Sequence, residues 1–176
     1  FLRAVKAERP TLTVLVPATI AAVTGHADWE KTDIGSLRAI ATGSMIVPGE
    51  MIEAIHARGV PVIQVYGSSE TAPIAIYQRI EKAQSTVGSM GRVGLHTAVR
   101  IVDSDDNDLG PGVPGEILVR GPHVASGYWD DADETSRAFT DGWFRTGDVA
   151  EYDANGDYWF RDRIKNVIIS GGENIY

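Results

Sequence analysis

The stretch that decides the fold is PGEMIEAIHARGVPVIQVYGSSET, at residues 48–71. Apolar residues recur at helical spacing over residues 48–58, and Gly59 follows where helices typically end. Residues 60–66 are then an apolar run in which only Gln64 is polar, as expected of a strand covered on both faces. In open α/β sheets, ligands gather at the carboxyl ends of such strands. The stretch therefore predicts a helix, a buried strand and a site in the polar turn that follows.

The residues before this stretch repeat the alternation of strand and helix. Residues 11–16 are a β-branched run, and Pro17 stands where a helix start favours proline. Gly25 marks the expected end of that helix, and residues 37–42 are again strand-like. This β-α-β-α-β order predicts an α/β fold, with part of a mixed or parallel sheet with helices.

The sequence changes character from about residue 86. Strand-like segments now alternate with turn residues; they are residues 99–102, 116–120, 149–152 and 158–161. Asn155-Gly156 lies between two of them and is a strong hairpin signal, while a helix-like insertion interrupts the series at residues 133–139. We expect an antiparallel, β-barrel-like subdomain over residues 86–163, after an α/β portion over residues 1–85.

The composition excludes several classes of function. Acidic residues outnumber basic ones by 24 to 16, which argues against a general affinity for nucleic acid. No apolar run approaches the roughly 20 residues of a transmembrane helix. The absence of cysteine rules out disulfides, thiolate nucleophiles and Cys-ligated zinc, and it fits a reducing, cytoplasmic compartment. Phe1 is neither an initiator Met nor the start of a signal peptide, so we expect a piece of a longer protein.

The turn after the buried strand has the composition of a phosphate and cation site. Gly67 allows a close backbone approach to a ligand, and the hydroxyls of Ser68 and Ser69 can meet phosphate oxygens. Glu70 can hold a hard cation through oxygen. A helix cap explains the same residues equally well, because Ser or Thr beside Glu is ordinary capping chemistry.

Two later segments offer polar groups suited to a nucleotide. Thr146-Gly147-Asp148 places a carboxylate at the expected mouth of a strand, where it can accept two hydrogen bonds from a ribose diol. An aspartate in an ordinary turn is the alternative. Residues 161–165 gather cations that could serve a triphosphate, although such clusters are more often a solvated strand edge.

Other patterns in the sequence do not support a site. The glycines of residues 88–94 have the spacing G-x-x-G-x-x-G, which is not a dinucleotide fingerprint, so we expect a crossing loop. Residues 103–108 resemble a calcium loop, but Asp108 replaces the turn glycine and Pro114 the bidentate glutamate. The histidines are scattered, and no G-x-S-x-G motif supports serine-hydrolase chemistry.

In their order along the chain, these segments resemble the adenylate-forming superfamily of acyl- and aryl-CoA ligases, luciferases and peptide-synthetase adenylation domains. The matching stretches are residues 37–48, 62–71, 88–94, 115–129, 141–148 and 162–176. Together they span nearly the whole chain. The resemblance implies an acid–thiol ligase that uses ATP, Mg²⁺ and CoA.

The resemblance also implies a role for particular residues around the base and phosphates of ATP. The segment that lines the adenine corresponds to Gly43, Ser44 and Met45. Tyr66 would stack on the adenine face, beside Gly67. Ser69 would meet the phosphates and Glu70 would hold Mg²⁺.

Further roles follow from the same resemblance towards the end of the chain. Asp148 and Arg163 would bind the ribose hydroxyls, so that Ser69, Glu70 and Arg163 form the expected catalytic set. Lys165 falls at the hinge about which a small C-terminal domain turns between half-reactions. Residues 164–176 would be that hinge and the truncated beginning of the domain, where Gly171 and Gly172 line the pantetheine channel.

The implied chemistry has two steps. A carboxylate attacks the α-phosphate of ATP to give an acyl-adenylate and pyrophosphate, and the thiol of CoA then displaces AMP. Met45 and Ile46 depart from the small residue and proline of many relatives, which would reshape the floor of the acyl pocket. Residues 44–46 and 67–74 suit a fatty or an aromatic acid.

Two expected parts of the machinery lie outside the sequence. They are a Gly/Ser/Thr-rich phosphate loop upstream and a late lysine downstream, so we expect the fragment alone to form no adenylate. Two alternatives stay open: a non-catalytic nucleotide- or partner-binding module of the same fold, and an adenylation domain that feeds a carrier protein.

Overall fold

The computed structural model describes residues 1–44, 47–164, 168–170 and 173–175, the last two ranges as backbone only. The chain forms two compact units. One comprises Phe1–Val65, Gln78–Gly88 and Ile168–Tyr176, and the other comprises Tyr66–Tyr77 and Ser89–Val167. The domain boundaries expected after residues 85 and 163 stay predictions.

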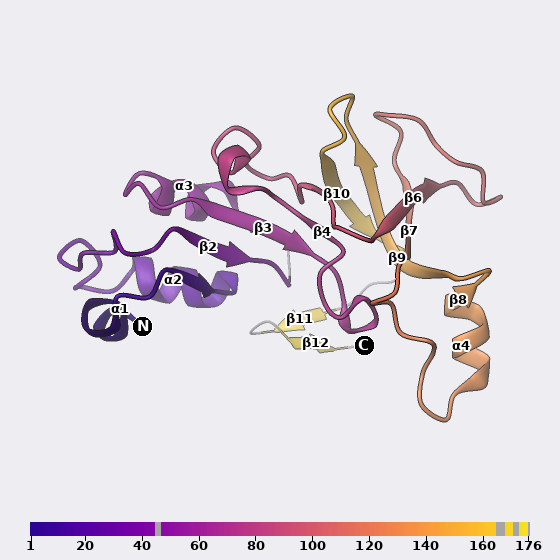
Figure 1. Ribbon diagram of the computed structural model, residues 1–176, viewed down its shortest axis with the longest axis horizontal. Helices are drawn as coiled ribbons and strands as arrows, with labels where there is room; N and C mark the ends of the chain where they lie inside the picture. The colour runs from indigo at the N-terminus through magenta and orange to yellow at the C-terminus, as the bar shows by residue number, and fades with distance from the viewer. Residues whose placement is uncertain (45–46, 165–167, 171–172, 176) are drawn as a thin grey trace. The chain divides into compact units, whose positions relative to one another are not determined.

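The first unit is built on parallel strands. They are β1 (Leu12–Val14), β2 (Ala39–Thr42) and β3 (Val62–Tyr66), with β2 paired to both of the others. The segments between them form helices, as Figure 1 shows. The predicted β-α-β-α-β order and the α/β fold class are therefore confirmed.

Helices begin and end in this unit where the local sequence favours it. α2 (Pro17–Thr24) starts with proline in its first turn, and the backbone N–H of Gly25 closes its last turn. α3 (Gly49–His56) precedes a left-handed Gly59, with φ of 79°. A further helix, α1 (Leu2–Glu8), and a 3₁₀ turn, η2 (Ile80–Lys82), complete the unit.

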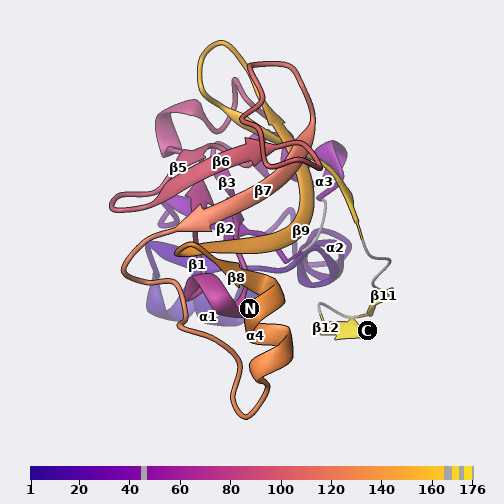
Figure 2. The ribbon, with the colours of Figure 1, turned by 90° about the vertical axis from the view of Figure 1, so that its right-hand side faces the viewer.

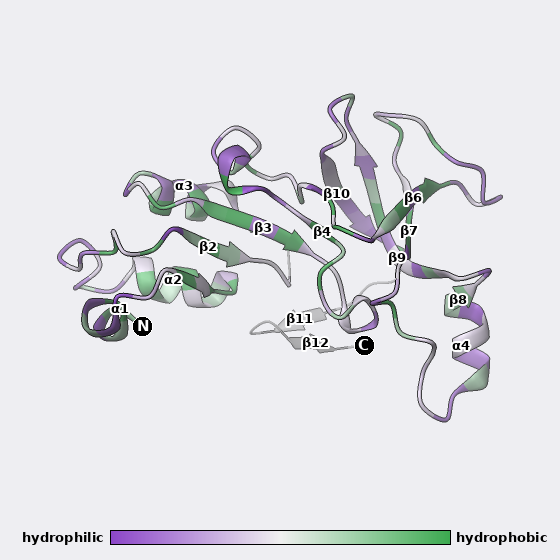
Figure 3. Cartoon of the chain, in the orientation of Figure 1, coloured by the Kyte–Doolittle hydropathy of each residue, from purple (hydrophilic) through white to green (hydrophobic). Residues whose placement is uncertain are grey.

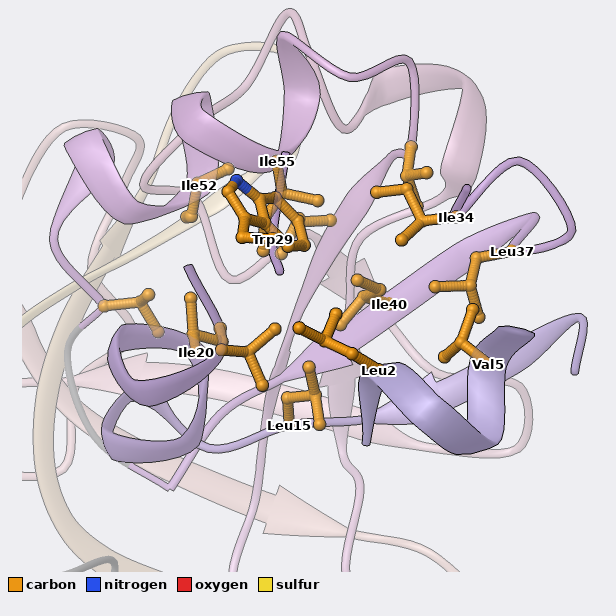
Figure 4. Packing of buried hydrophobic residues seen from close by; sticks show 14 residues of the cluster. Leu2, Val5, Leu15, Ile20, Trp29, Ile34, Leu37, Ile40, Ile52 and Ile55 are labelled. Carbon is orange, nitrogen blue, oxygen red and sulfur yellow. The ribbon is translucent and has the colours of Figure 1, made fainter. Parts of the chain in front are cut away.

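Apolar side chains from these helices and strands form the core of the first unit. The hydropathy colours of Figure 3 show the apolar character of β2 and β3. Figure 4 shows Trp29 lying against Ile52 and Ile55 of α3. The buried members of this core are Leu2, Val5, Leu15, Ile20, Val23, Trp29, Ile34, Leu37, Ile40, Val47, Ile52, Ile55, Val60 and Val62.

The second unit is dominated by an antiparallel sheet with the strand order β10-β9-β7-β6, and β8 also pairs with β9 (Figure 2). Its strands are β6 (Ala98–Val102), β7 (Gly115–Arg120), β8 (Phe139–Thr140), β9 (Trp143–Tyr152) and β10 (Tyr158–Arg163). The helix α4 (Ala132–Ala138) precedes β8. The unit also contains η1 (Ser69–Thr71) and the antiparallel pair β4 (Ile76–Tyr77) and β5 (Arg92–Val93). The expected antiparallel, barrel-like subdomain is confirmed.

The turns of this sheet follow the predicted chemistry. Gly156 of the Asn-Gly pair has φ of 80°, and the Asp153 carboxylate accepts hydrogen bonds from the backbone N–H groups of Asn155 and Asp157. Asp103 caps its own turn in the same way, as expected of a hairpin.

Two details of the second unit refine the sequence-based expectations. β9 begins at Trp143, several residues earlier than expected, so Asp148 lies within a strand and not at its mouth. The sequence-based expectation had the strand over residues 149–152. In the crossing loop, Met90 donates its backbone N–H to the Tyr158 carbonyl, which ties the loop to β10.

The last described residues form the antiparallel pair β11 (Ile168–Ser170) and β12 (Glu173–Ile175). None of the helices in the described part of the chain has both the length and the apolar character that a membrane crossing requires.

Candidate active site

Tyr66, Asp148 and Arg163 come together within the second unit. The Tyr66 hydroxyl donates to Oδ2 of Asp148 at 2.8 Å, and Nε of Arg163 lies 2.8 Å from Oδ1 of the same carboxylate. Asp148 and Arg163 are direct partners across β9 and β10, whereas Tyr66 ends β3. Sequence reasoning placed all three at a nucleotide site, and the structure joins them in one hydrogen-bonded group.

A bulge in β9 aims Asp148 at its partners. On β7, Leu118 pairs with Arg145 and Glu116 with Val149, so two steps along β7 match four along β9. Gly147 adopts φ of 69° within the bulge, which is the left-handed region that glycine enters without strain. The motif that sequence analysis treated as a possible turn is thus a strand irregularity that redirects a carboxylate.

The hydroxyl of Thr146 forms hydrogen bonds with the backbone on both sides of the bulge. Thr146 Oγ1 donates to the Ile117 carbonyl at 2.8 Å and accepts the backbone N–H of Asp148 at 3.1 Å. The Gly147 carbonyl accepts the backbone N–H of Ile164 at 2.8 Å. These bonds satisfy backbone groups that the interrupted ladder would otherwise leave unpaired.

An ion-pair network supports the bulge from β7. One oxygen of Glu116 accepts the backbone N–H of Gly147 at 3.2 Å, and the other lies 2.6 Å from Nη2 of Arg145. Arg145 also pairs with Asp106 at 2.6 Å, and hydrogen bonding by these carboxylates raises its pKa. Neither Glu116 nor Arg145 was among the predicted site residues. Only strand pairing brings Glu116 beside the Thr-Gly-Asp motif, and no local pattern links it to Arg145, which directly precedes Thr146.

The surroundings of Tyr66 keep its hydroxyl protonated, so that it can donate a hydrogen bond. Burial, followed by the nearby charge of Asp148, raises the pKa of Tyr66 well above its usual value. Burial also raises the pKa of Asp148, although the hydrogen bonds from Tyr66 and Arg163 oppose this shift. The phenol is therefore protonated at neutral pH, and its ring packs against the apolar core of the second unit.

The turn at residues 67–71 is a 3₁₀ turn whose shape is fixed from within. The hydroxyl of Thr71 accepts the backbone N–H of Ser68 at 2.8 Å and donates to backbone carbonyls nearby. A Cβ at Gly67 would lie 1.7 Å from the Pro73 carbonyl oxygen, so glycine is required by the turn itself. The capping interpretation holds for this geometry, and it leaves Ser69 exposed for a ligand.

Glu70 is held at both its main chain and its side chain. Its carbonyl accepts the backbone N–H of Ala125 at 2.8 Å, and its Oε1 accepts the hydroxyl of Tyr128 at 2.8 Å. Burial raises the pKa of Glu70, but hydrogen bonding by Ser68 and Tyr128 outweighs this and holds it below the usual value. The carboxylate is therefore charged at neutral pH. Tyr128 was not predicted, and no local sequence signal links it to Glu70.

The remaining predicted residues fall in the first unit or outside the described residues. Gly43 follows β2, and a Cβ there would lie 2.6 Å from the Val65 carbonyl oxygen, so two strands approach closely at this point. Ser44 is exposed, with φ of 75°. The assignments to Met45, Lys165, Gly171 and Gly172 lie outside the described residues.

The described side chains can serve a small anionic ligand with a planar base. A half-buried phenol ring, a buried carboxylate and a guanidinium offer one apolar surface and hydrogen-bonding groups for hydroxyls. Among the described residues, no three His, Asp or Glu side chains gather in a way that could hold a metal ion.

Comparison with known proteins identifies the family. The model of the AMP-binding enzyme family matches residues 1–129, and the chain belongs to that family. An indoleacetate–CoA ligase from Aromatoleum aromaticum is 50% identical over 98% of this chain and 34% of its own length. A feruloyl-CoA synthase from Amycolatopsis is 40% identical over 99% of the chain and 36% of its own.

A solved structure agrees with these relatives. The o-succinylbenzoate–CoA synthetase of Bacillus subtilis, in complex with ATP and magnesium ion, superposes with a TM-score of 0.84. It is 30% identical, over 99% of this chain and 36% of that one. The chain thus spans about a third of the length of the curated relatives it matches.

Proposed function

We propose that this chain is the AMP-holding part of an ATP-dependent acid–CoA ligase, which activates a carboxylic acid as its acyl-adenylate and transfers the acyl group to CoA. The joined group of Tyr66, Asp148 and Arg163 carries the proposal, because it presents the groups that adenosine requires. Membership in the AMP-binding family and the CoA-ligase names of the relatives support it.

In this proposal each residue meets one part of ATP. The adenine stacks on the ring of Tyr66, which is partly buried. The ribose hydroxyls donate to the Asp148 carboxylate, whose two oxygens have lone pairs beyond those used by Tyr66 and Arg163. Arg163 also contacts the ribose, through nitrogens other than Nε.

The phosphates lie over the turn that follows Tyr66, where the exposed hydroxyl of Ser69 binds a phosphate oxygen. Glu70 fits Mg²⁺, because a charged carboxylate held by a hydrogen bond is the one protein ligand this ion commonly needs beside substrate phosphates. Mg²⁺ supplies charge neutralisation on the phosphates when it is bound.

The chemistry is a pair of displacements at a positioned adenylate. A carboxylate oxygen of the acid attacks the α-phosphorus of ATP, and the bond to the bridging oxygen breaks to release pyrophosphate. The CoA thiol then loses its proton and attacks the acyl carbonyl, and AMP leaves with the electrons of the acyl–oxygen bond. The described residues contribute by holding the adenosine and phosphate groups still while these bonds change.

The chain spans about a third of the length of its curated relatives, and we propose that it does not catalyse these steps alone. We propose a longer parent protein that supplies the phosphate loop and the late lysine, with its hinge at Lys165 and a cytoplasmic location. The named substrates of the two relatives, indoleacetate and ferulate, are aromatic acids, and they favour an aromatic over a fatty acid.

The test is acid-dependent pyrophosphate release by the full-length protein, with ATP and a panel that includes indoleacetate, ferulate and a medium-chain fatty acid. We expect turnover with an aromatic acid, formation of its CoA thioester, and none with the 176-residue chain alone. ATP binding without pyrophosphate release would instead indicate a non-catalytic module. Adenylate formation without thioester would indicate an adenylation domain that feeds a carrier protein.

A further inference from the structure

The loop at residues 125–128 forms hydrogen bonds with Glu70 at two points. The Ala125 backbone N–H binds the Glu70 carbonyl, and the Tyr128 hydroxyl binds the Glu70 carboxylate, both at 2.8 Å. One contact fixes the main chain and the other fixes the side chain. Two residues of one loop, distant from Glu70 in sequence, therefore hold it: Ala125 fixes its main chain and Tyr128 its side chain.

Tyr128 is itself held firmly by α4 and β8. Its backbone N–H donates to Thr135 Oγ1 of α4 at 2.8 Å, and its ring meets the Phe139 ring edge-on at 5.6 Å. Phe139 in turn packs against Phe144 of β9, with ring centroids 5.0 Å apart. The hydroxyl of Tyr128 is thus carried on a supported ring, although the side chain lies at the surface.

The close passage of the loop over α4 adds to this support. A Cβ at Gly127 would lie 2.5 Å from the Thr135 side chain, and Gly127 has φ of 155°. Glycine is needed here because the backbone has no room for a side chain. The position of Tyr128 relative to α4 is therefore narrowly determined.

The geometry points to Tyr128 as a positioning residue for the metal-binding carboxylate of Glu70, an inference that rests on the proposed function. The hydrogen bond from Tyr128 occupies one lone pair of Oε1, and the carboxylate has further lone pairs for a cation beyond those used by Tyr128 and Ser68. Partners of this kind fix the orientation of a metal ligand and strengthen its binding. Tyr128 acts through Glu70 and contacts neither the nucleotide nor the reacting atoms.

The test is Tyr128→Phe in the full-length protein, which removes the hydroxyl and keeps the ring on Phe139. We expect the Mg²⁺ concentration for half-maximal pyrophosphate release to rise about tenfold, while kcat at saturating Mg²⁺ stays near that of the wild type. The affinity for ATP, measured by calorimetry at a series of Mg²⁺ concentrations, should shift along the Mg²⁺ axis in the same way.

Tyr152→Phe is the matched control. It also removes a tyrosine hydroxyl from the second unit, but that hydroxyl donates to the Leu109 carbonyl at 3.2 Å. We expect the Mg²⁺ dependence of this variant to match that of the wild type. An equal shift in both variants would mean that loosening the sheet is the cause, and the proposal would be wrong.

A double-mutant cycle of Tyr128→Phe with Glu70→Gln measures the interaction between these two side chains. Once the carboxylate is gone, Tyr128→Phe should produce no further change in the Mg²⁺ dependence of ATP affinity. Additive effects, or a Tyr128→Phe variant that loses activity equally at all Mg²⁺ concentrations, would overturn the inference. A wild-type protein without acid-dependent pyrophosphate release would instead overturn the proposed function.

Discussion

The two short segments that carry the candidate site are built in different ways. The turn at residues 67–71 is shaped by its own residues and the proline that follows. The Thr71 hydroxyl accepts the backbone N–H of Ser68, and a side chain at position 67 would clash with the Pro73 carbonyl. The bulge at residues 146–148 is shaped by the neighbouring strand β7, which supplies a carbonyl and the Glu116 carboxylate. We therefore expect substitutions within residues 67–71 to destabilise the turn. We expect the bulge to be destabilised by substitution of a residue distant in sequence.

Gly67→Ala tests the internal control of the turn and should have the largest effect. The new Cβ would meet backbone atoms of Pro73, which cannot swing aside as a flexible side chain would. We expect a loss of about 3 kcal/mol in the free energy of unfolding, measured by urea denaturation of the chain.

Gly110→Ala is the control for this change, because a Cβ at Gly110 would meet nothing within 4 Å. We expect its effect on the free energy of unfolding to stay within about 0.5 kcal/mol. If both variants lost the same stability, the close approach of Gly67 to Pro73 would not be what requires glycine in the turn.

The contrast also explains what the sequence could and could not reveal. The buried strand, its helix and the polar turn are encoded by adjacent residues, so residues 48–71 predicted them correctly. The same holds for the hairpin at Asn155-Gly156. Local patterns set these features because spacing and turn chemistry act over a few residues.

Local sequence patterns could not predict the bulge in β9 or the hydrogen bonds that hold Glu70. Gly147 did not reveal the bulge, because a glycine that adopts positive φ looks the same in a turn and in a bulge until the partner strand is known. Tyr128 and Glu116 reach the site only through pairing and packing of distant segments. The resemblance to a family named Asp148 and Arg163, but it did not show that Tyr66 joins them by a hydrogen bond.

Glu116→Ala tests the external control of the bulge and should have a smaller effect. The Gly147 N–H loses its acceptor, and Arg145 loses its ion pair with Glu116. We expect a loss of about 2 kcal/mol in the free energy of unfolding. Hydrogen exchange at the Gly147 amide should become faster, while exchange at the Ser68 amide in the turn should not change.

Glu151→Ala provides the comparison on the same strand. Glu151 pairs with the exposed Arg161, and within the part of the chain that the structure describes its side chain makes no hydrogen bond to the bulge. An exposed pair contributes about 0.5 kcal/mol, so this variant should lose much less stability than Glu116→Ala and leave exchange at Gly147 unchanged. Equal losses would place the stabilising effect in surface charge and not in the bulge.

The bond that joins the two segments, from Tyr66 to Asp148, should give the smallest effect, and one that depends on pH. The pKa of Tyr66 is raised on folding, so its contribution to stability is complete below the unfolded value near 10 and is lost as pH rises above it. By pH 11 the wild type should lose about 1.4 kcal/mol of unfolding free energy from this group.

Tyr66→Phe cannot ionise, so urea denaturation between pH 8 and pH 11 should show the two proteins converging in stability as pH rises. The exposed-site variant Tyr77→Phe should instead follow the wild-type curve, and parallel curves for Tyr66→Phe and the wild type would show that the phenol is not held un-ionised between the turn and the bulge.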